Sequence, residues 1–93
     1  MKWMVTEDLV LRAMQTAAAP WGGYIVDDLR RRQRAAVSDG ATGHPPKASQ
    51  VLRRCRALEA KGLIECEGGP FGYYGFHWKL TQAGKDRLHE IGA

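Results

Sequence analysis

The residue types that could bind a metal are few in this sequence and lie far apart. Cys55, Cys66, His77 and His89 follow one another at intervals of 11, 11 and 12 residues. Zinc ligands usually come in pairs that are separated by about two to five residues. We therefore expect no metal site and two reduced thiols that serve packing. Because no export signal is recognisable, these cysteines predict a cytoplasmic protein.

Residues that could perform catalysis form no recognisable motif. The sequence contains no phosphate-binding loop, no H-E-x-x-H motif and no nucleophile elbow. Asp27 and Asp28 are adjacent, so on a helix their carboxylates point in different directions. A domain of 93 residues also offers little room for the cleft of about 300 Å³ that ligands usually occupy. We expect a protein that is not an enzyme and that carries no cofactor.

A glycine-rich and aromatic stretch, GGPFGYYGFHWKLTQAG, occupies residues 68–84. It could be a phosphate-binding loop, an aromatic cage, a metal site around His77 or a hairpin. A phosphate loop requires a helix immediately after it, whereas FHWKL alternates as a strand. Phe76, Trp78 and Leu80 share one face of that strand, and His77 and Lys79 share the other. The stretch therefore predicts an antiparallel hairpin with its tip at GGPFGYYG.

Positive charge is concentrated in the middle of the chain. The net charge is +4 overall but +7 between Arg30 and Lys61. Such asymmetry is typical of proteins that bind a polyanion, although a basic helix face is often only solvated. No apolar run is long enough for a membrane span.

The elements that must position these residues follow from capping and periodicity. We expect helices over 7–18, capped by Thr6, over 24–37, and over 46–61, opened by Pro45 or Pro46. Apolar residues at Val51, Cys55 and Leu58 form the buried side of the third helix. After the hairpin, Thr81 caps a short last helix over 82–91. The order predicts one α+β domain over residues 1–93.

Two motifs within residues 47–90 resemble winged helix-turn-helix proteins, in particular bacterial transcription regulators of the MarR and PadR types. Leu58, Glu59, Gly62, Leu63 and Ile64 match the end of their recognition helix. Leu80, Thr81 and Gly84 match the strand that leads into their next helix. The resemblance implies a three-helix core, a two-stranded β-hairpin wing over residues 68–76 and a short C-terminal helix. It also implies a small transcriptional regulator that binds double-stranded DNA.

The resemblance makes helix 46–61 the element that enters the major groove. A helical projection places Ser49, Gln50, Arg53 and Arg56 opposite the buried side, as candidates for contacts at or near the bases. The candidates for contacts with the DNA backbone are Lys47, Arg54, Arg31, Arg34, Tyr73 and Tyr74.

Two departures from the resemblance keep an alternative open. Residues 38–46 form a link of about nine residues, where a helix-turn-helix normally has about three or four. Only a short tail, residues 85–93, is available for the dimer contacts that these regulators make through additional helices. A homodimer is therefore an open alternative, for which the sequence offers no large interface. The alternative function is a winged-helix module that binds another protein without reading DNA sequence.

Overall fold

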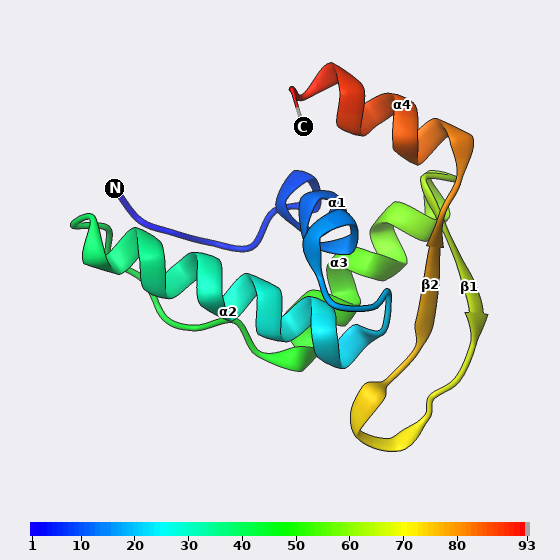
Figure 1. The fold of residues 1–93 in the computed structure, drawn as a ribbon, viewed down its shortest axis with the longest axis horizontal. Helices are drawn as coiled ribbons and strands as arrows, with labels where there is room; N and C mark the ends of the chain where they lie inside the picture. Colours follow the sequence, from blue (N-terminus) through cyan, green and yellow to red (C-terminus); the bar gives the residue numbers. More distant parts are fainter. Residues whose placement is uncertain (93) are drawn as a thin grey trace.

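The computed structural model describes residues 1–92 and has the expected α+β order (Figure 1). Three helices precede a two-stranded antiparallel hairpin, and a fourth helix follows it. A short 3₁₀ helix, η1, lies at the hairpin tip. The elements are α1 (Glu7–Thr16), α2 (Gly22–Ser38), α3 (Ala48–Ala60), β1 (Ile64–Gly68), η1 (Gly72–Tyr74), β2 (His77–Leu80) and α4 (Gln82–Glu90).

The predicted end of the first helix, at residue 18, and the predicted start of the second, at residue 24, each differ from the structure by two residues. The helix α1 is capped by Thr6, as expected, but it ends at Thr16 because Ala17 is extended. The helix α2 starts at Gly22, two residues before the expected start, so Gly22 and Gly23 lie in its first turn. Asp27 and Asp28 consequently lie outside the first turn of α2, and the last turn of α2 carries no basic residue.

The close approach of the hairpin tip requires glycine at position 23, in the first turn of α2. A Cβ at Gly23 would lie 2.8 Å from the carbonyl oxygen of Tyr73, in the hairpin tip. The segment before α2 also extends the hairpin, because Trp78 N donates to Pro20 O at 2.9 Å and Gly22 N donates to Phe76 O at 2.9 Å. Trp21 thus forms an isolated antiparallel bridge with His77 of β2, which periodicity did not reveal.

The core lies where the helices meet the inner face of the hairpin. Val51, Cys55 and Leu58 are buried on α3, and Trp78 on β2 is 1% exposed, as the sequence predicts. Phe76 and Leu80 pack against this core at its edge. The third helix nevertheless begins at Ala48 rather than at a proline, and Pro46 is buried in the preceding loop.

The two sequence motifs that carry the resemblance meet at one junction of the fold. Thr81 Oγ1 donates to Gly62 O at 2.6 Å and accepts from Gly84 N at 3.1 Å. Thr81 N donates to Leu63 O at 3.1 Å. Gly84 is buried against this same carbonyl oxygen, with which a Cβ would overlap. Together the motifs join the end of α3 to the start of α4, so they specify the fold rather than a binding site.

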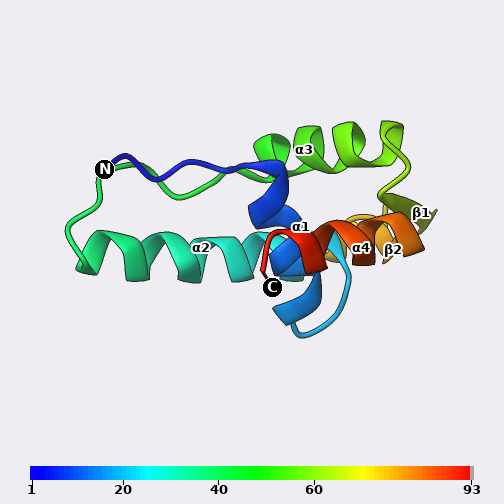
Figure 2. The same ribbon diagram turned by 90° about the horizontal axis from the view of Figure 1, so that it is seen from above.

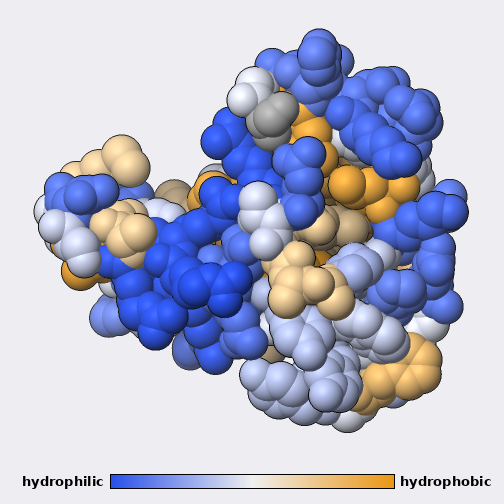
Figure 3. Space-filling view, viewed as in Figure 1, coloured by the Kyte–Doolittle hydropathy of each residue, from blue (hydrophilic) through white to orange (hydrophobic). Residues whose placement is uncertain are grey.

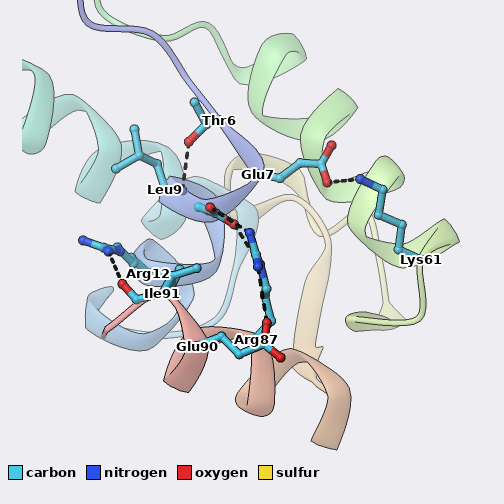
Figure 4. A network of polar contacts seen from close by, with 9 residues as sticks. Thr6, Glu7, Leu9, Arg12, Lys61, Arg87, Glu90 and Ile91 are labelled. Carbon is cyan, nitrogen blue, oxygen red and sulfur yellow. Dashed lines mark hydrogen bonds and ion pairs between the residues drawn. The ribbon is translucent and has the colours of Figure 1, made fainter.

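Polar contacts between α1 and its neighbours hold the last helix in place (Figure 4). Arg87 of α4 pairs with Asp8 at 3.2 Å, and Arg12 Nη2 donates to Ile91 O at 2.8 Å. The negative charge of Asp8, followed by the hydrogen bond to Glu90, raises the pKa of Arg87. On the other side, Lys61 pairs with Glu7 at 2.6 Å, so it is occupied in joining α3 to α1.

Candidate nucleic-acid interface

The exposed face of α3 carries the side chains that the helical projection placed there. Ser49, Gln50, Arg53 and Arg56 are exposed, and Arg54 is half-buried at the edge of this face. Figure 2 shows α3 along one edge of the molecule, with no other element on its outer side. The predicted division of α3 into a buried and an exposed face is therefore confirmed, because the buried residues of α3 point towards the other helices and the hairpin.

Gln50 and Arg56 are less available than their exposure suggests. The side-chain oxygen of Gln50 accepts a hydrogen bond from Lys47 N at 3.0 Å, which caps the start of α3. Arg56 pairs with Glu59 at 2.9 Å, and its guanidinium lies 4.7 Å from the ring centre of Phe76. Arg56 thus covers the hairpin, in the geometry of a cation–π contact. Within residues 1–92, Arg53 forms no ion pair and no side-chain hydrogen bond.

A groove of about 640 Å³ lies beside the start of α3 and gathers several of the predicted residues. It is lined by four predicted residues, Lys47, Gln50, Arg53 and Arg54. The sequence of α3 alone does not reveal this groove. Lys2 and His44 also line the groove and were not predicted, because they come from segments that meet only in the fold. None of its lining residues is acidic; the others are Trp3, Met4, Val5, Pro45 and Pro46.

The arginines of α2 do not act as one basic face. Arg30 donates to Pro46 O at 3.2 Å, while Arg32 and Arg31 pair with the buried Asp28 at 2.8 and 3.4 Å. Arg34 is exposed and has no ion pair within residues 1–92. The area over α2 is strongly hydrophilic on the face seen in Figure 3. Of the two predicted contacts on α2, Arg34 is free and Arg31 is already engaged.

The hairpin tip, residues 69–76, lies against the start of α2. Tyr74 packs on Tyr24 and Trp21, with ring centres 5.7 and 6.0 Å apart. Tyr73 is 75% exposed, and its hydroxyl lies 3.4 Å from Asp27 Oδ2. Neither tyrosine lines the groove beside α3. Tyr74 therefore serves packing first, and Tyr73 is the more accessible of the two predicted wing contacts.

A second cavity contradicts the expectation that so small a domain lacks room for a ligand-sized cleft. It measures about 340 Å³ and lies between α2, α3 and the hairpin tip. Most of its wall is apolar and includes Val26, Leu52, Phe76 and Trp78. Four glycines, Gly22, Gly23, Gly72 and Gly75, also line the cavity and contribute no side chain to it. Asp27 and Arg30 are its charged residues.

The two cysteines differ in environment. Cys55 is 1% exposed, and burial raises the pKa of its thiol to about 12 from an ordinary value of 9.0. The nearby charge of Arg56 acts in the opposite direction but is the smaller influence. Cys66 is half-buried, and its thiol lies 3.5 Å from Gly68 O. Because the thiolate is the reactive form, Cys55 is inert in the folded protein.

We therefore expect selective alkylation of the native protein. Treatment with iodoacetamide at pH 8 should modify Cys66 and leave Cys55 intact, as peptide mass spectrometry would show. Both cysteines should react after denaturation, which is the control for reagent access. Equal labelling of both in the native state would contradict the buried position of Cys55.

The described part of the chain brings no three side chains of His, Cys, Asp or Glu together as a metal-binding group. Across residues 1–92, no helix has the length and apolarity that crossing a membrane requires. Comparison of the chain with models of protein families, with curated proteins and with solved structures gives no match.

Proposed function

We propose that this protein is a small winged-helix regulator of transcription that binds double-stranded DNA through α3. One observation carries the proposal: the N-terminal half of α3 presents unpaired cations on a surface without carboxylates. Lys47, Arg53 and Arg54 belong to this surface. Cations that form no internal ion pair remain available to replace the counterions of a phosphate backbone.

The shape of the molecule agrees with such a role. An exposed helix can enter the major groove, and no element covers the outer side of α3 (Figure 2). The order of three helices, a hairpin and a fourth helix is compatible with a winged helix, and the bridge between Trp21 and His77 ties the segment before α2 to the hairpin. The long link before α3 is held by hydrogen bonds from Trp3 N to Thr42 O and from Gln33 to Gly43 O.

The proposal assigns different roles to the exposed side chains. Arg53 is unpaired and can donate two hydrogen bonds to O6 and N7 of guanine. Ser49 and the free amide nitrogen of Gln50 lie one turn earlier, while Lys47 and Arg54 bind phosphates. Arg56 supports the hairpin instead of contacting bases, because its guanidinium already lies over Phe76. Arg34 and Tyr73 contribute backbone contacts at the edges, and Arg31 does so beside its pairing with Asp28 because its side chain is 57% exposed.

Neutralising Arg31 and Arg34 together tests whether α2 contacts phosphates. We expect the double alanine variant to bind all duplexes more weakly by the same factor. The slope of log affinity against log salt should fall by about 0.9 for each lost contact. Fluorescence anisotropy with a labelled random duplex measures this slope, and Lys85→Ala on α4 is the control for a change in charge.

The same titration tests the proposed function itself. If the unaltered protein binds no duplex even at low salt, the alternative of a protein-interaction module replaces DNA binding. A salt slope that stays constant in the double variant would instead remove α2 from the interface and leave α3 in place.

A further inference from the structure

The first five residues form an arm that lies along the loop before α3 (Figure 2). Trp3 N donates to Thr42 O at 2.7 Å, and Thr42 N donates to Met1 O at 2.9 Å. The arm and the loop therefore pair as two short parallel segments. Trp3 is 8% exposed, so its side chain anchors the arm in the core. The arm is a structured part of the domain beside α3.

The loop is fixed in turn by α2. Gln33 is 4% exposed, and its side chain donates to Gly43 O at 2.9 Å. Gly43 has φ +129, which favours glycine, and a Cβ there would lie 2.5 Å from the carbonyl oxygen of Trp3. Glycine at this position thus permits the close approach of arm and loop. These contacts fasten a link that is unusually long for a helix-turn-helix to both α2 and the arm.

The arm and the loop each supply a side chain with nitrogen donors to the groove of about 640 Å³ beside α3. Lys2 comes from the arm, His44 and Lys47 from the segment before α3, and Arg54 from the middle of α3. No carboxylate lines the groove, and neither Lys2 nor Arg54 forms an ion pair within residues 1–92. A positive groove of this kind, bordered by the apolar side chains of Trp3 and Met4, suits a sugar-phosphate chain.

We propose that the arm and the loop form a clamp for one strand of the DNA backbone, next to the major groove that α3 enters. This inference rests on the proposed function and extends it with two residues, Lys2 and His44. Lys2 and Lys47 act as point charges, whereas the guanidinium of Arg54 can bind two phosphate oxygens at once. Such contacts add affinity that is independent of base sequence and position α3 in its register.

The variants Lys2→Ala and Arg54→Ala, singly and together, test the clamp. Affinities for a selected duplex and for a random duplex are measured by anisotropy over a range of salt concentrations. We expect both duplexes to lose affinity by the same factor. The salt slope should fall by about 0.9 in each single variant and by about 1.8 in the double variant. Lys85→Ala removes one charge from α4 and should leave the slope nearly unchanged.

A second variant displaces the arm while it keeps every charge. Gly43→Ala introduces a Cβ against Trp3 O, so we expect the same loss of affinity on both duplexes as for Lys2→Ala. Circular dichroism verifies that the helices remain folded, and Lys2→Ala keeps the test valid if Gly43→Ala does not fold. Ethylation interference identifies the phosphates that binding requires. We expect Lys2→Ala to abolish interference at phosphates next to those that α3 requires.

The outcomes separate the clamp from the proposed function. If Lys2→Ala and Gly43→Ala bind with unchanged affinity and slope while Arg53→Ala loses base preference, the clamp is wrong and DNA reading by α3 stands. If the unaltered protein binds no duplex, both proposals fail. A loss that is confined to the selected duplex would also overturn the clamp, because phosphate contacts cannot distinguish sequences.

Discussion

Replacing Arg53 with alanine is expected to weaken binding to a selected duplex by about 1–3 kcal/mol and to relax base preference at one position. The reason is that Arg53 is exposed on the outer face of α3 and carries a guanidinium without an internal partner. In the proposed complex its loss would remove two hydrogen bonds to a base, and within residues 1–92 the substitution breaks no ion pair and no side-chain hydrogen bond. Selection of binding sites from a random pool, followed by anisotropy on single-base variants, measures both effects.

Arg56→Ala is the matched control on the same helix. Arg56 is also exposed, but it pairs with Glu59 and lies 4.7 Å from the ring centre of Phe76. We expect this change to lower the melting temperature slightly and to leave base preference intact. The result that would contradict the assignment is the reverse pattern, with preference lost in Arg56→Ala and retained in Arg53→Ala.

Replacing Gly84 with alanine is expected to destabilise the fold by about 1–3 kcal/mol, the usual cost of overpacking a core. The new Cβ would overlap the carbonyl oxygen of Leu63, which is backbone and cannot rotate away. That oxygen also accepts the hydrogen bond from Thr81 N at 3.1 Å. The higher helix propensity of alanine, about 0.8–1 kcal/mol, offsets only part of this cost. Urea unfolding followed by circular dichroism measures the change.

Gly22→Ala is the control for a glycine-to-alanine change in a first helical turn. A Cβ at Gly22 would make only ordinary contacts, the nearest at 3.6 Å. The variant should be as stable as the unaltered protein, or more stable by up to about 1 kcal/mol, because alanine restricts the unfolded chain. If Gly84→Ala unfolds at the same urea concentration as Gly22→Ala, the junction between Leu63 and Gly84 is not tightly packed.

The helices could be predicted because their signals are local. Thr6 and Thr81 each accept a hydrogen bond from a backbone N–H three residues later, as their positions indicated. The buried side of α3 followed from the spacing of its apolar residues. The predicted start of α2, at residue 24, was wrong because glycine is unfavourable in a helix on local grounds. In the folded chain, the close approach of the hairpin tip requires glycine at position 23, and that contact is not visible in the sequence.

The candidate site was predicted only in part. The exposed side of α3 followed from helical periodicity, so Ser49 and Arg53 were placed correctly on the outside. Exposure alone could not show that Arg56 is engaged with Glu59 and the hairpin. The grouping of Lys2 with Arg54 depends on the pairing of the arm with the loop, some 40 residues apart in the chain.

The class of fold, the buried and exposed sides of α3 and the concentration of basic charge could all be inferred from the amino-acid sequence. These properties depend on residue type and on short spacings, which local backbone geometry converts directly into faces and caps. The folded arrangement was needed to show which cations remain free and which segments meet. Whether a charged side chain is available depends on partners that come from other elements, such as Pro46 O for Arg30 and Glu7 for Lys61.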